Sequence, residues 1–148
     1  MELIVLMGIP ASGKSSFYKR NFFTTYMRIS LDLFNTRNKE RQFLNLALSL
    51  HQRVVIDNTN VVRAERADYI RMAREKKYSV TGYYFESKRN VCIERNEGRK
   101  GKEKIERKGI LYKHKMLELP AYEEGFDKLY YVSLQGDAFT IYDWKNEI

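Results

Sequence analysis

The sequence predicts an α/β fold, with a mostly parallel sheet and helices on both faces, because strand-like and helix-like segments alternate along the 148 residues. The apolar run at residues 2–7 begins this alternation and predicts a buried strand. Only two prolines occur and no Ser/Gly-rich linker divides the chain, so we expect residues 1–148 to form one domain. A chain of this length can bury an adequate core without disulfides, and its single cysteine, Cys92, can form none internally.

The later elements follow at regular intervals. Apolar and β-branched stretches predict strands at residues 26–30, 53–57, 79–85, 128–133 and 138–143, with a Gly136-Asp137 turn before the last. Helical spacing of apolar residues predicts helices at residues 14–23, 38–50, 62–76, 88–97 and 109–118, the last one ended by Pro120. In such a sheet the carboxyl ends of the parallel strands share one edge, and ligands bind in the crevice outside it.

The strongest signal in the sequence is a phosphate-binding loop, Gly8–Ser15, which reads G-I-P-A-S-G-K-S. It fits the pattern G-x-x-x-x-G-K-[ST], follows an apolar strand and begins a helix, which is the context that this motif requires. Backbone N–H groups and the positive end of a helix suit phosphate oxygens, so the sequence predicts a P-loop NTPase fold. The residues expected to hold the nucleotide are Gly8, Ala11, Ser12, Gly13, Lys14, Ser15 and Ser16.

The loop implies ATP as phosphoryl donor and Mg²⁺ as the ion that accompanies it. We expect Lys14 to hold the β- and γ-phosphates and Ser15 to give its hydroxyl to the metal. Asp57 is the acidic residue at the end of an apolar run. This is the Walker-B pattern, in which the carboxylate supports Mg²⁺ directly or through water. The alternative for Asp57 and the Asn58-Thr59-Asn60 segment after it is a simple turn, because Asp and Asn also favour turns.

Asp32 is the candidate catalytic base. It follows the strand predicted at residues 26–30, slightly beyond the sheet edge. A carboxylate in that position could accept the proton of an attacking hydroxyl group. The alternative is that Asp32 caps a helix before Leu33, a role that Asp also performs well.

Residues 95–108 form a basic segment that could act as a mobile lid. Its basic members are Arg95, Arg99, Lys100, Lys102, Lys104, Arg107 and Lys108. Gly98 and Gly101 interrupt the helix and permit motion, and the planar forks of Arg95 and Arg99 suit phosphate oxygens in the transition state. The alternative is a solvated, flexible loop without a catalytic role.

The net charge of +8 favours polyanionic partners, although solubilising lysines would give the same number. The N-terminal apolar run is too short to span a bilayer and lacks a cationic leader, and no later stretch approaches membrane-spanning length. We therefore expect a cytoplasmic chain with no membrane partner, and the sequence leaves the oligomeric state open.

Four segments together resemble the kinase domain of polynucleotide 5′-hydroxyl kinases in order and spacing, over about residues 3–119. They are Gly8–Ser15, Ile29–Asp32, Val55–Asn60 and the pair Arg95 and Arg99. The resemblance implies that Asp32 is the base for the acceptor 5′-OH and that the two arginines form the lid. It also implies acceptor or loop contacts for Asp57, Asn58, Thr59 and Asn60. Some relatives carry an arginine three residues beyond the base, where this chain has Asn35, and Arg37 is the nearest candidate to grip an acceptor phosphate.

The sequence thus predicts an ATP-dependent phosphotransferase whose favoured acceptor is the 5′-OH of DNA or RNA. One alternative is a kinase of a nucleoside, sugar or nucleotide sugar, which Asn35 favours slightly. The other is a non-catalytic nucleotide-binding module. Residues 124–148 receive no role beyond completing the sheet.

Overall fold

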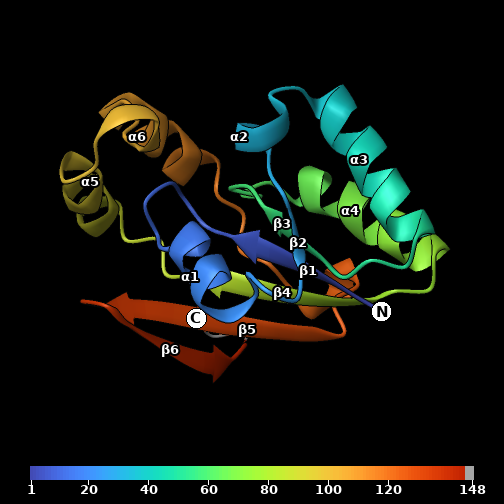
Figure 1. The fold of residues 1–148 in the computed structure, drawn as a ribbon. Helices are drawn as coiled ribbons and strands as arrows, with labels where there is room; N and C mark the ends of the chain where they lie inside the picture. Colours follow the sequence, from blue (N-terminus) through green and yellow to red (C-terminus); the bar gives the residue numbers. More distant parts are fainter. Residues whose placement is uncertain (146–148) are drawn as a thin grey trace.

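The strands of the chain form one six-stranded sheet in the order β2-β3-β1-β4-β5-β6 (Figure 1). The computed structural model describes residues 1–145, so residues 146–148 of the predicted domain lie outside the described part. The strands are β1 (Glu2–Met7), β2 (Met27–Ile29), β3 (Val54–Asp57), β4 (Ser79–Phe85), β5 (Lys128–Gln135) and β6 (Ala138–Asp143). All neighbouring strands pair in parallel except β6, which is antiparallel to β5. The predicted sheet is therefore confirmed, and β5 and β6 complete it.

Within the described residues, six α-helices and two short 3₁₀ helices connect the strands. They are α1 (Lys14–Asn21), α2 (Leu31–Phe34), α3 (Arg37–Ser49), α4 (Arg63–Glu75), α5 (Arg89–Glu97), α6 (Arg107–Met116), η1 (Gly101–Glu103) and η2 (Tyr122–Glu124). The sequence did not predict α2, η1 or η2, because a single turn is too short to show apolar periodicity. Within residues 1–145 no helix is long and apolar enough to cross a membrane.

Helices cover both faces of the sheet because its inner strands are apolar on both sides. In β1, Leu3 and Val5 belong to the cluster that contains Leu44 of α3 and Ile70 of α4. Ile4 and Leu6 of the same strand point the other way, into the cluster of Phe17 and Tyr18 from α1. All residues named here are buried, which is the pattern expected of a parallel strand between two helix layers.

A third cluster joins α5 and α6 to the phosphate loop. It contains Ile9 and Ala11 of the loop, Cys92 of α5 and Ile110 of α6, and Cys92 and Ile110 are completely buried. In Figure 1 the α5–α6 pair therefore lies at the carboxyl edge of the sheet, across from α2. The phosphate loop runs between these two groups of elements.

Candidate active site

The phosphate loop is fixed by backbone geometry and by hydrogen bonds to the ends of neighbouring strands. Gly13 precedes α1 with φ 105°, and a Cβ there would lie 2.9 Å from Leu134 Cδ2. The N–H of Gly8 donates to the carbonyl of Thr59 (2.9 Å), and the N–H of Ile9 donates to Ser87 Oγ (3.1 Å). Because the first N–H groups of α1 have no intrahelical partner, the loop presents fixed donors for an anion.

Lys14 folds back over this loop. Its Nζ donates to the carbonyls of Gly8 (2.8 Å) and Ile9 (2.9 Å), and it lies 3.4 Å from Ser12 Oγ. Burial lowers the pKa of Lys14 from 10.5 to about 8, partly offset by the charge of Asp57. The charges of Asp32 and Arg99 also act on this ammonium group. Lys14 thus feels the charges of the candidate base, of a candidate metal ligand and of a lid arginine.

The lowered pKa of Lys14 predicts a proton uptake on nucleotide binding. The folded state releases the proton near pH 8 and the unfolded chain only near pH 10.5, so between these values the contribution of Lys14 to stability rises with pH. Below pH 8 both states carry the charge, and its burial costs about 3 kcal/mol. Phosphate oxygens would stabilise the ammonium form and raise its pKa again.

We therefore expect ADP affinity to fall about tenfold per pH unit above pH 8, because the free protein must first take up a proton. Calorimetric titrations in buffers of different ionisation enthalpy would measure this proton at pH 8.5. The variant Lys14→Met should lose the pH dependence, and an equal proton uptake in the variant would contradict the assignment to Lys14.

Ser15 and Asp57 provide the oxygen atoms expected for Mg²⁺. Ser15 Oγ donates to Asp57 Oδ2 (2.9 Å), and the same oxygen accepts from Arg28 Nε at 2.7 Å. A hydroxyl and a carboxylate fit Mg²⁺, which prefers oxygen ligands and completes its shell with phosphate oxygens and water. Arg28 of β2 supplies a positive charge beside this buried carboxylate.

Asp32 lies exposed in the first turn of α2. The helix is capped by Ser30, whose Oγ accepts from the N–H of Asp32 (3.2 Å), so Asp32 is not the N-cap residue that the alternative interpretation required. Asn35 ends α2 with φ 68°, a left-handed conformation that favours Asn and strains most other residues. This explains physically why an arginine would be disfavoured at position 35.

The segment after Asp57 contacts the protein itself. Asn58 Oδ1 accepts from the N–H of Leu31 (2.8 Å), which attaches β3 to the start of α2. The carbonyl of Thr59 holds Gly8. Asn60 is completely buried and donates to the carbonyl of Leu6 (2.7 Å), so its side chain supports β1 rather than facing a substrate. The resemblance implied contacts to the acceptor or to the phosphate loop for this segment. The hydrogen bond of Thr59 shows a contact to the loop.

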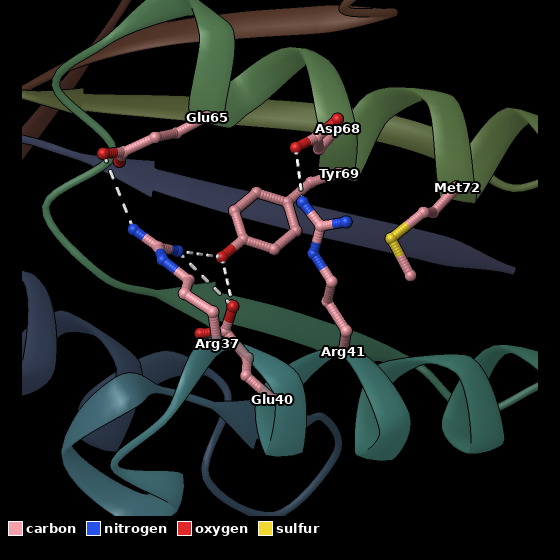
Figure 2. A pocket seen from close by; sticks show the side chains of 7 residues that line it. All are labelled: Arg37, Glu40, Arg41, Glu65, Asp68, Tyr69 and Met72. Atoms are coloured by element: carbon pink, nitrogen blue, oxygen red, sulfur yellow. Dashed lines mark hydrogen bonds and ion pairs between the residues drawn. The ribbon is translucent and has the colours of Figure 1, made fainter.

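Arg37, the predicted acceptor residue, lies in a small pocket of about 70 Å³ between α3 and α4 (Figure 2). Its guanidinium donates to Tyr69 Oη (2.8 Å) and lies 3.5 Å from a carboxylate oxygen of Glu40 and 3.5 Å from one of Glu65. About half of the Arg37 side chain is exposed, whereas Glu40 is buried. The structure therefore directs Arg37 toward two acids of its own chain.

The basic segment runs from the end of α5 through η1 to α6. Arg95 donates to the carbonyls of Ala11 (3.3 Å) and Leu134 (2.9 Å), which anchors α5 to the phosphate loop and to β5. Arg99 donates to the carbonyl of Glu103 (3.2 Å), and the side chain of Asn96 bonds both backbone groups of Ile105. These bonds close the segment into a compact loop, which Arg95 attaches to the phosphate loop. The mobility of the segment stays a prediction.

A wider pocket of about 450 Å³ opens beside Arg95. Its lining residues are Glu86, Lys88, Val91, Glu94, Arg95, Leu134, Gln135 and Gly136. Because Arg95 also touches the phosphate loop, this pocket adjoins the site where a triphosphate would sit.

Sequence reasoning did not identify four residues that contribute to this region. Ser87 follows β4 at the same edge as the other polar residues, which was a usable signal. Glu40 precedes Leu44 and Ala47 at helical spacing, so an acid on the apolar face of α3 was also visible. Nothing in the sequence pattern singled out Arg28 or Tyr69, because an arginine in a strand and a tyrosine in an amphipathic helix are both common.

Comparisons with known proteins agree with this geometry. A family model described as an AAA domain matches residues 3–115. A protein of Acanthamoeba polyphaga mimivirus, named as a bifunctional polynucleotide phosphatase/kinase, is 33% identical over 97% of this chain. The chain spans about a third (36%) of that relative's length.

Two solved structures share the fold at low identity. Kti12 of Chaetomium thermophilum in complex with ADP-AlF3 is 17% identical, with a TM-score of 0.62 and 88% of each chain covered. A gluconokinase from Sinorhizobium meliloti 1021 is 19% identical, with a TM-score of 0.61, and the match covers 89% of this chain and 82% of the other. These structures confirm the predicted P-loop fold. The mimivirus relative confirms the resemblance to polynucleotide kinases.

Proposed function

The chain belongs to the AAA domain family of P-loop proteins, and from this membership and its site we propose that it is an ATP-dependent kinase that phosphorylates the 5′-OH of a nucleic acid. The observation that carries the proposal is the geometry of the phosphate loop. The Lys14 ammonium group closes over the loop, and Ser15 beside it bonds Asp57, the candidate metal ligand. Phosphoryl transfer requires mainly positioning and charge neutralisation, which such a cluster provides.

The proposed reaction assigns each of these groups a task. The phosphate loop and Lys14 hold the triphosphate, and the pocket beside Arg95 receives the nucleoside part of ATP. Asp32 takes the proton of the acceptor hydroxyl, whose oxygen attacks the γ-phosphorus while the bond to the leaving ADP breaks. Arg99 neutralises charge on the transferred group. Mg²⁺, held by Ser15 and Asp57 together with phosphate oxygens, would supply further charge neutralisation.

The basic character of α6 favours a nucleic-acid acceptor. Residues 107–116 contain five basic or histidine residues and no acid: Arg107, Lys108, Lys113, His114 and Lys115. Among the exposed residues of this helix, Tyr112 offers an aromatic surface beside these charges. Positive charge with an interleaved aromatic ring is the combination that binds single strands, since phosphates pair with the cations and a base stacks on the ring.

We expect the double variant Arg107→Gln/Lys115→Gln to raise the KM for a 5′-OH oligonucleotide about tenfold in low salt, with the KM for ATP unchanged. The reason is the loss of two phosphate contacts, which should also flatten the salt dependence of KM. Steady-state assays at several salt concentrations measure both effects. Lys76→Gln/Lys77→Gln is the matched control, because these exposed lysines follow α4 and precede the amino end of β4, away from the site. Equal effects in the two double variants would contradict a specific role of α6.

The second candidate is a kinase of a small metabolite. The observation that favours it is the position of Arg37, which pairs with Glu40 and Glu65 instead of reaching toward an acceptor phosphate. The same loop, base and lid would serve a sugar or a nucleoside equally well.

A paired acceptor screen tests the proposal. ATP labelled in the γ-phosphate is incubated with the protein and either 5′-OH oligonucleotides of DNA and RNA or a set of sugars and nucleosides. We expect label at the oligonucleotide 5′ end. Label on a metabolite alone would establish the second candidate, and ATP binding without transfer to any acceptor would indicate a non-catalytic module.

A further inference from the structure

Glu40 is a buried acid that the proposed reaction does not use. Its side chain is 1% exposed and lies in α3, and three donors surround its carboxylate. These are Tyr69 Oη, Asn58 Nδ2 at 2.7 Å and the Arg37 guanidinium at 3.5 Å. Figure 2 shows Arg37, Glu40 and Tyr69 directed toward one another between α3 and α4. A buried carboxylate with this many donors has its hydrogen-bonding capacity satisfied, so it fixes the groups that donate to it.

Asn58 links this cluster to the catalytic side of the sheet. Its amide nitrogen donates to Glu40 and lies 3.2 Å from Tyr69 Oη, so its oxygen must face the other way. That oxygen accepts from the N–H of Leu31 at 2.8 Å. Leu31 is the first residue of α2, directly before Asp32. The chain of hydrogen bonds therefore runs from Glu40 through Asn58 to the helix that carries the proposed base.

The helix α2 depends on such external support. It has four residues, none of them fully buried; Ser30 caps it, and Phe34 stacks on Phe43 of α3 at 4.5 Å and packs at the margin of the core. One turn of helix with so little burial does not hold a side chain in place by itself. A displacement of about 1 Å at a reacting group can lower a rate about a hundredfold.

We propose that Glu40, Tyr69 and Asn58 form a positioning unit that holds α2, and with it Asp32, at the point of phosphoryl transfer. The proposal rests on the proposed kinase function. It deepens that function, because three residues outside the phosphate loop would then contribute to the rate of phosphoryl transfer. Arg37, the one exposed partner of this unit, is its counter-charge.

Two variants test the unit. Tyr69→Phe keeps the ring and removes the hydroxyl that donates to Glu40, and Glu40→Gln keeps the shape and removes the charge. We expect each to lower kcat for 5′-OH phosphorylation about tenfold or more, with the KM for ATP and the affinity for ADP unchanged within twofold. In both variants the Leu31 amide should exchange its hydrogen at least tenfold faster by NMR, while amides of β1 keep their protection.

Arg41→Gln is the matched control. Arg41 lies one turn further along α3, lines the same pocket and pairs with Asp68 at 2.6 Å on the surface. It has no bond to Asn58 among the described contacts, so its loss should leave kcat and Leu31 exchange unchanged.

The outcomes separate this inference from the function on which it rests. If the wild-type protein transfers label to no acceptor, the proposed function fails. If the wild-type protein is active and both variants keep its kcat, the positioning unit is overturned, whatever the exchange of Leu31. A fall in ADP affinity together with kcat would also overturn it, because the network would then support the phosphate loop rather than Asp32.

Discussion

Replacement of Lys14 by methionine should lower kcat/KM for phosphoryl transfer about a thousandfold, the largest effect that we expect from a single change. The buried ammonium group of Lys14 donates to the carbonyls of Gly8 and Ile9 in the phosphate loop. Removing one preorganised donor to a developing charge typically costs two to three orders of magnitude. Methionine has nearly the same length and no charge, so packing over the loop is kept.

The control for this change is Lys19→Met, which removes an exposed lysine from the same helix. Steady-state kinetics with a saturating acceptor and varied ATP would measure both variants. We expect the control to retain its activity within twofold. An active Lys14→Met protein would mean that the loop does not hold the reacting phosphates.

Asp32→Asn should lower kcat about a hundredfold or more while leaving nucleotide affinity intact. The amide is nearly isosteric and can still occupy the first turn of α2, but it cannot accept the proton of the acceptor hydroxyl. The loss should therefore appear in kcat and in kcat/KM equally, as for an interaction made only in the transition state. Rapid-quench measurement of a single turnover, with ADP binding measured separately, distinguishes the two quantities.

Asp68→Asn provides the same chemical change at a surface position of α4, where the aspartate pairs with Arg41. This control should be indistinguishable from the wild-type protein in kcat. A normal single-turnover rate in Asp32→Asn would remove Asp32 from the mechanism and leave the exposed aspartate without an assigned role.

The parallel sheet could be predicted because its strands are short apolar runs buried on both sides, as β1 shows. The first helix and the loop before it could be predicted because the phosphate motif fixes both backbone and chemistry. The short helix α2 could not, because its capping Ser30 and left-handed Asn35 are local choices that many turns share. The structure places Asp32 within this helix and not at its N-cap, which contradicts the alternative role given to Asp32.

The partners of the site residues could not be predicted for a different reason. Arg28 reaches Asp57 only because β2 and β3 pair in the register that places Arg28 beside Val55. Glu40 reaches Asn58 only because α3 packs on the face of the sheet that Val54 and Ile56 of β3 line, and Asn58 directly follows β3. Both contacts depend on tertiary packing between segments far apart in the sequence, which composition and periodicity do not encode.

The most direct test of the account is a calorimetric titration of the wild-type protein with ATP in the presence of Mg²⁺, at pH 7, where Lys14 carries its charge. We expect saturable binding of one nucleotide per chain, and a large loss of affinity in Lys14→Met. Absence of binding by the wild-type protein would contradict the assignment of the loop, and with it every role given to the residues around Lys14.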